Sequence, residues 1–132
     1  MDVTDWMKGY IRRTQVAPDR AVLIKEGEPA KVPLVILKGQ AKVQKRTSRG
    51  WITVDTLTEG AVIGEMQIIA PALGAGSATI VADGPITVGL LDVKRIEAEI
   101  EALSGPLKEV LRALVFRLRE ATEDLGLAVA ER

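Results

Sequence analysis

Cysteine and histidine are both absent from this sequence of 132 residues. Without cysteine, the chain has no disulfide, no thiol nucleophile and no thiolate metal site. Without histidine, it lacks a common ligand for transition metals and the commonest general base. Aromatic residues are scarce too, with two Trp, one Tyr and one Phe, so aliphatic side chains must fill the core. These absences disfavour a metal-dependent barrel enzyme, because such enzymes usually hold their metal with several histidines.

Basic residues are missing from one long stretch. Between Gly50 and Val93 there is no Lys or Arg, and the acidic residues there are Asp55, Glu59, Glu65, Asp83 and Asp92. The formal net charge of the whole chain is zero, which gives no reason to expect bulk attraction to nucleic acid or to an anionic membrane. No apolar run suits a signal peptide or a membrane span. We expect a cytoplasmic protein.

Hydrophobic residues make up 47% of the chain, which predicts a folded domain, and the length fits a single domain over residues 1–132. Within it we predict an N-terminal amphipathic helix over residues 4–13, inside the segment 1–15, with Thr4 as its N-cap. Residues 20–91 have the short alternating runs and glycine turns of a closed or double-sheet antiparallel barrel. Residues 92–125 have helical periodicity.

The strand region divides at its turns. We predict strands over residues 21–24, 32–37, 41–44, 51–57, 78–82 and 86–90, with a hairpin turn at Thr47-Ser48-Arg49-Gly50 and a turn at Asp83-Gly84-Pro85. The basic residues around the hairpin (Lys42, Lys45, Arg46 and Arg49) are interpreted as a solvated edge that discourages strand-to-strand aggregation.

Two helices are predicted to end the chain. Asp92 is a suitable N-cap for a helix over residues 93–103, and Pro106 suits the first turn of the next helix. In that second helix, apolar residues recur at alternating spacings of four and three, which is a heptad pattern. Its leucines are Leu107, Leu111, Leu114, Leu118 and Leu125. From the residues alone, this seam suits either packing on the chain's own barrel or contact with a second copy.

Residues 60–82 carry the candidate site. Gly64 suits a backbone with positive φ at the end of a strand. Glu65 then opens a short helix, where free N–H groups favour an anion, and Ser77-Ala78 leads into the next strand. A carboxylate beside unsatisfied N–H groups suggests a site that binds a hydroxyl group and an anion together.

The order of Gly64-Glu65, a short helix, and Ser77-Ala78 before a strand resembles the phosphate-binding cassette of cyclic nucleotide-binding domains, as found in catabolite-activator-type regulators. The resemblance implies a mainly β fold with flanking helices, namely an eight-stranded jelly-roll-like β-roll of the double-stranded β-helix type. It implies that the ligand-binding residues are Gly64, Glu65, Met66, Gly76, Ser77 and Ala78, with Glu65 accepting a hydrogen bond from the ribose 2′-OH. It also implies a stand-alone regulatory domain that is not catalytic, and it favours a homodimer formed through the last helix.

The sequence departs from the family pattern at one important position. The resemblance places an arginine, which pairs with the cyclic phosphate, directly before Ser77-Ala78, where this chain has Gly76. We therefore expect cAMP or cGMP to bind weakly, unless a base arrives from Arg112, Arg117 or Arg119. The alternative is a degenerate domain that binds no nucleotide and serves protein interaction or dimerisation. In catabolite-activator-type proteins a DNA-binding helix-turn-helix follows, for which we expect no room before Arg132.

Overall fold

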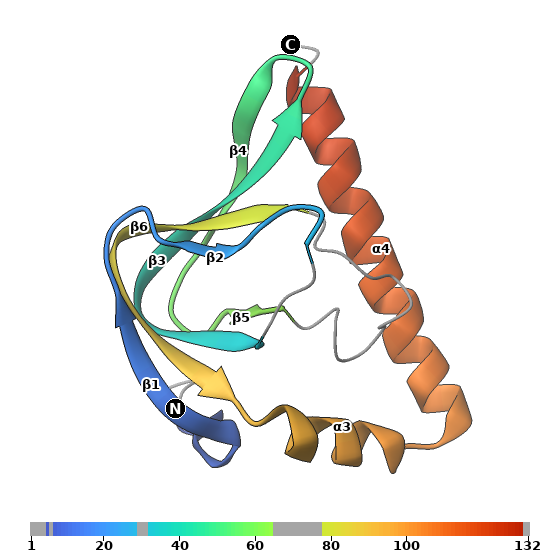
Figure 1. The fold of residues 1–132 in the computed structure, drawn as a ribbon. Coiled ribbons are helices and arrows are strands. Elements are labelled where there is room, and N and C mark those ends of the chain that lie inside the picture. The colour runs from blue at the N-terminus through green and yellow to red at the C-terminus, as the bar shows by residue number, and fades with distance from the viewer. Residues whose placement is uncertain (1–4, 6, 29–31, 65–77, 131–132) are drawn as a thin grey trace.

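In the computed structural model, residues 5, 7–28, 32–64 and 78–130 are described, with side chains up to Ala121 in the last helix. The described elements are η1 (Lys8–Tyr10), β1 (Ile11–Ala17), β2 (Val22–Ile24), β3 (Leu34–Thr47), β4 (Gly50–Leu57), β5 (Val62–Ile63), β6 (Thr79–Leu91), α3 (Val93–Glu101) and α4 (Gly105–Ala130). Figure 1 shows a curled antiparallel sheet with the two α-helices beside it. The mainly β fold with flanking helices, predicted from the sequence, is confirmed.

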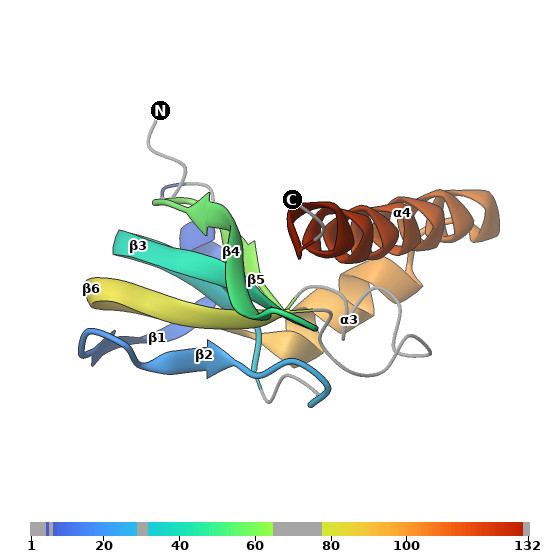
Figure 2. The same cartoon turned by 90° about the horizontal axis from the view of Figure 1, so that it is seen from above.

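The sheet is organised on two long strands. Its order is β1-β6-β3-β4, with β2 also paired to β6 and β5 also paired to β3. Residues 34–38, at the beginning of β3, pair with residues 87–90 at the end of β6. Residues 40–44 of β3 pair with Thr79–Asp83 at the beginning of β6. Each long strand therefore contributes one paired segment to each half of the roll. Figure 2 shows β3 and β6 side by side from above. The described part has six strands rather than the expected eight. The strands expected over residues 32–37 and 41–44 form the single strand β3, and those expected over residues 78–82 and 86–90 form the single strand β6.

The predicted turn at Asp83-Gly84-Pro85 is wrong, because β6 runs through these residues. The register changes there instead: Gln40 pairs with Asp83 and Lys38 pairs with Thr87, so β6 has more residues than β3 between these two pairs. Gly39 has a φ of +96°, and a Cβ at this position would lie 2.8 Å from the carbonyl oxygen of Pro85. Glycine therefore lets the two strands bend together without separating.

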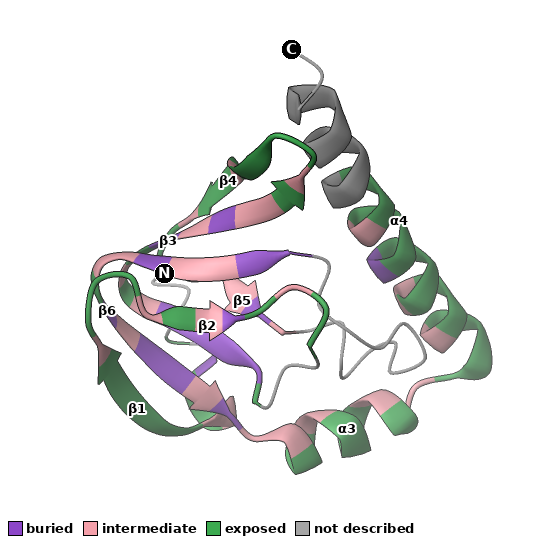
Figure 3. Ribbon diagram, turned by 45° about the horizontal axis from the view of Figure 1, so that its top comes forward, coloured by how far each residue is buried: buried purple, intermediate pink, exposed green. Residues whose placement is uncertain are grey.

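Both faces of the first half of β3 are covered. Leu34 and Ile36 belong to the cluster inside the roll, whereas Val35 contacts a second cluster with Met7 and Leu91. This second cluster is covered by η1 and α3, through Tyr10 and Ile96. A strand buried on both faces reads as a continuous apolar run, as residues 34–37 do. Figure 3 shows the buried residues concentrated on β3 and β6.

The N-terminal helix is shorter than predicted. Asp5 and Met7 are helical and η1 follows, but β1 begins at Ile11, so the prediction of a helix up to residue 13 is wrong. Residues 11–17 pair with Ile86–Leu91 of β6, and this ladder overrides the helical periodicity of the segment. The predicted N-cap, Thr4, lies outside the described residues.

The C-terminal helices begin where the sequence predicts. The Arg95 backbone N–H donates to the Asp92 side chain at the start of α3, at 3.3 Å. Ser104 caps α4 by accepting from the Leu107 N–H at 3.3 Å, and Pro106 lies in the first turn. α4 packs beside the β3–β4 hairpin. In the described part of the chain, no helix is long and apolar enough to cross a membrane.

Candidate functional site

The two ends of the predicted cassette are held by the sheet. On one side, β5 pairs with Leu34 and Val35 of β3, and the residue that follows β5, Gly64, has a φ of +86°. On the other side, Ala78 is buried and β6 begins at Thr79. The positive φ predicted at Gly64 is therefore confirmed. The remaining predicted ligand residues (Glu65, Met66, Gly76 and Ser77) lie outside the described residues, so their roles remain predictions.

A charged pair lies beside the start of β6. The Lys45 Nζ atom of β3 is 3.3 Å from Oε1 of Glu26, and the two side chains are only 15% and 24% exposed. Glu26 is also tied to β6, because its backbone N–H donates to the buried Thr79 Oγ1 at 2.9 Å. A partly buried ion pair is costly to desolvate and is retained only where its partners are well placed.

The interpretation of the basic hairpin as a solvated edge is therefore wrong for Lys45. It holds for Arg46 and Arg49, which are exposed, and Arg46 lies over the ring of Trp51 at 5.7 Å. Lys42 is 45% exposed and lies 3.8 Å from Asp83. The sequence contained a signal for Lys45: it continues the alternation of Ala41 and Val43, which are both buried.

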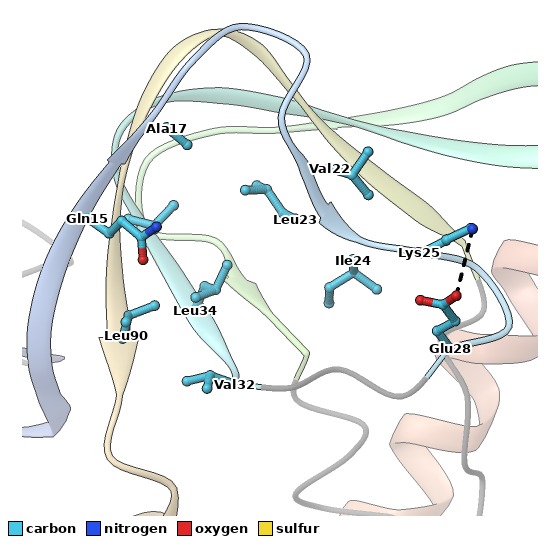
Figure 4. Close-up of a pocket in the computed structure, with 11 residues that line it drawn as sticks. Gln15, Ala17, Val22, Leu23, Ile24, Lys25, Glu28, Val32, Leu34 and Leu90 are labelled. Atoms are coloured by element: carbon cyan, nitrogen blue, oxygen red, sulfur yellow. Dashed lines mark ion pairs between the residues drawn. The ribbon is translucent and has the colours of Figure 1, made fainter.

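A separate cavity of about 460 Å³ opens between β1, β2, β3 and β6. Most of its lining is aliphatic, and its polar groups are Gln15 and the exposed pair of Lys25 and Glu28, whose Nζ and Oε1 atoms are 3.7 Å apart (Figure 4). Its lining residues are Gln15, Ala17, Val22, Leu23, Ile24, Lys25, Glu28, Val32, Leu34, Val88 and Leu90. Neither Gly64 nor Ala78 lines this cavity, so it does not coincide with the described ends of the cassette.

The apolar seam of α4 is mostly exposed on this chain. Leu107, Leu114 and Leu118 are 46%, 55% and 51% exposed, and Leu111 is half-buried. Val115, which lies beside the leucine seam and widens the apolar face of the helix, is buried at 6% exposure. The side chain of Leu125 lies outside the described residues. The helix therefore packs on its own roll through the side that contains Val115, next to the leucine seam.

The described fold is a curled antiparallel sheet with helices beside it, in which the predicted cassette lies in sequence between β5 and β6. The family model of the cyclic nucleotide-binding domain matches residues 14–102, which is more than half of the chain. The chain therefore belongs to the cyclic nucleotide-binding domain family. Resemblance to this family, predicted from the cassette motif, is confirmed.

Solved structures agree with this fold. A cyclic nucleotide-binding domain from Methylobacillus flagellatus KT has 29% identity and a TM-score of 0.63, and the match covers 96% of this chain and 71% of that one. The cAMP-bound EAL enzyme Bd1971 has 19% identity and a TM-score of 0.76, over 89% of this chain. The match spans only 30% of that enzyme's chain.

A third similar structure is the regulatory subunit of a cAMP-independent protein kinase A from Trypanosoma brucei. It has 22% identity and a TM-score of 0.55, and the match covers 62% of this chain and 30% of that one. That structure is of a triple mutant with cAMP bound in the A site. No curated protein matches the sequence.

Proposed function

We propose that this domain is a non-catalytic regulatory module that binds a cyclic nucleotide, cAMP or cGMP, weakly. The site consists of Gly64, Glu65, Met66, Gly76, Ser77 and Ala78. The observation that carries the proposal is the position of the two ends of the cassette: Gly64, with a positive φ, directly follows β5, and the buried Ala78 directly precedes β6. The weakness follows from Gly76, which stands where the family pattern has an arginine.

The expected loss of affinity follows from the missing charge. A hydrogen bond to a charged group contributes about 1.5–3 kcal/mol, and each 1.4 kcal/mol corresponds to about tenfold in affinity. Loss of the arginine alone therefore weakens binding by about ten- to a hundredfold.

Calorimetric titration with cAMP tests the proposal. Gly76→Arg restores the family pattern and is expected to strengthen binding tenfold or more, and Glu65→Ala on that background is expected to reverse much of the gain. Gly74→Arg adds the same charge two residues away and serves as the matched control. Low-micromolar binding by the wild type contradicts the expected weakness. If Gly76→Arg changes nothing, the alternative of an interaction module that binds no nucleotide replaces the sensor function.

We also propose that α4 pairs with a second copy of the chain through Leu107, Leu111, Leu114, Leu118 and Leu125. The observation that favours this is the exposure of the seam: Leu107, Leu114 and Leu118 are about half exposed, although they lie on one stripe of the helix. A stripe of leucines left outside the core is typical of a helix–helix contact.

Light scattering tests the homodimer. The wild type is expected at twice the monomer mass, and the double variant Leu114→Asp with Leu118→Asp at one monomer mass, because each aspartate places a charge in an apolar contact. Phe116→Asp is the matched control, since Phe116 is 46% exposed but lies on the other side of the helix from Leu114. A wild type that is monomeric at high micromolar concentration refutes the proposal.

A further inference from the structure

Lys45 reaches the interior side of the roll although it belongs to the basic hairpin. In the ladder between β3 and β6, Ala41 pairs with Ala82 and Val43 pairs with Ile80. Side chains alternate along a strand, so Lys45 shares the face of Ala41 and Val43, both of which are buried. Its side chain is 15% exposed, whereas that of Lys42, on the opposite face, is 45% exposed.

The same ladder brings Lys45 to the end of the cassette. Gln44 pairs with Thr79, so the next residue of β3 lies level with Ala78, the last of the predicted ligand residues. Glu26 contacts both strands at this point. Its backbone N–H donates to Thr79 Oγ1 of β6, and its carboxylate lies 3.3 Å from the Lys45 ammonium group of β3. Three segments distant in sequence therefore meet where the cassette enters β6.

Positive charge near the predicted cassette must come from outside residues 51–93. Residues 51–93 contribute no basic side chain, and the family pattern requires a positive charge near Ser77-Ala78. The ammonium group of Lys45 brings one from a neighbouring strand, partly removed from water, where an ion pair with an anion is stronger than at the surface. In the free domain, Glu26 balances this charge.

We propose that Lys45 binds the phosphate of the cyclic nucleotide in place of the absent cassette arginine, and that Glu26 competes with the ligand for it. This inference rests on the proposed function, because it assigns a residue to that same site. A lysine is a point charge without the planar fork of an arginine. Lys45 in the role of the cassette arginine would therefore attract the phosphate, but it would not form the bidentate contact that an arginine makes.

The test is an NMR titration with cAMP up to millimolar concentration, which measures weak affinities. Lys45→Met is expected to weaken binding at least tenfold, whereas Lys45→Arg retains it. Glu26→Gln is expected to strengthen binding severalfold, because the competing carboxylate is gone. Lys42→Met removes the same charge from the other face of β3 and is expected to leave the affinity unchanged.

The outcomes separate this inference from the function on which it rests. Equal cAMP affinity of wild type and Lys45→Met overturns the role of Lys45 and leaves the proposed function intact. Absence of binding by both wild type and Glu26→Gln also overturns it, and the Gly76→Arg titration then decides the proposed function independently. If Lys45→Met fails to fold, the double variant Lys45→Met with Glu26→Gln removes both charges and leaves none uncompensated. Undiminished binding by that double variant overturns the inference, and a tenfold loss supports it.

Discussion

Replacement of Gly39 with alanine tests whether the close approach of β3 and β6 holds the two halves of the roll together. Gly39 has a φ of +96°, and the added Cβ would meet the Pro85 carbonyl oxygen at 2.8 Å and the Ile86 Cα at 3.3 Å. Both contacts are with backbone, so neither is relieved by a side-chain rotation. Gly50 offers a matched control, since its φ is +95° and a Cβ there would meet nothing within 4 Å.

The two variants differ by the clash alone. An alanine held at positive φ costs about 1–2 kcal/mol, and this term applies to both. The clash at Gly39 adds about 1–3 kcal/mol, the usual range for an overpacked site. Unfolding entropy of about 2.1 cal/mol/K per residue means that each kcal/mol lowers the melting temperature by roughly 4 °C for a chain of this length. We therefore expect a decrease of about 4–8 °C for Gly50→Ala and about 8–20 °C for Gly39→Ala.

Thermal unfolding followed by circular dichroism measures both variants under the same conditions. Equal decreases for Gly39→Ala and Gly50→Ala would refute the reasoning, because only the shared backbone term would then contribute. A decrease confined to Gly39→Ala would instead mean that positive φ is tolerated at the hairpin and that the contact with Pro85 supplies the whole cost.

Three further predictions concern the helices and their contacts. Val115→Ala is expected to lower the free energy of unfolding by about 1.5–3 kcal/mol, because Val115 is 6% exposed. Urea unfolding measures this loss, and a value below about 0.5 kcal/mol, which is typical of surface substitutions, contradicts the prediction. Asp92→Ala removes the α3 cap and is expected to cost about 1 kcal/mol in the same assay, whereas an unchanged midpoint would show that the cap is dispensable. Tyr10 is expected to titrate above pH 10, because its hydroxyl donates to the Glu99 carboxylate, which raises the pKa of the phenol above 10.0. Absorbance measures it directly, since the sequence has one Tyr, and Glu99→Gln should return the pKa towards its usual value. The stabilisation from this contact is complete below pH 10 and is lost as pH rises through the raised pKa of Tyr10. A Tyr10 pKa at or below 10 in the wild type contradicts the predicted effect of the hydrogen bond.

Local signals predicted most of the elements correctly. The hairpin turn before Gly50, the Asp92 cap and Pro106 in the first turn of α4 each depend on the conformational preference of a single residue. The prediction failed where two segments distant in sequence pair with each other. Residues 11–13 have a helical pattern but form part of β1, and Asp83-Gly84-Pro85 has turn residues but continues β6. In both places, ladder hydrogen bonds to a neighbouring strand outweigh a weak local preference.

The sequence by itself determined the class of fold, the family, the hairpin turn before Gly50 and the start of each C-terminal helix, because these depend on residue type and short-range spacing. Only the tertiary structure decided what each face meets. Periodicity places Lys45 with Ala41 and Val43, but it does not show that Glu26 lies opposite, because that contact depends on the pairing of distant strands. Likewise, the heptads of α4 identify a leucine seam, and only packing on the roll shows that Val115 is buried while Leu114 remains exposed. A repeat defines which residues share a face, and the surface that covers this face is determined by the rest of the fold.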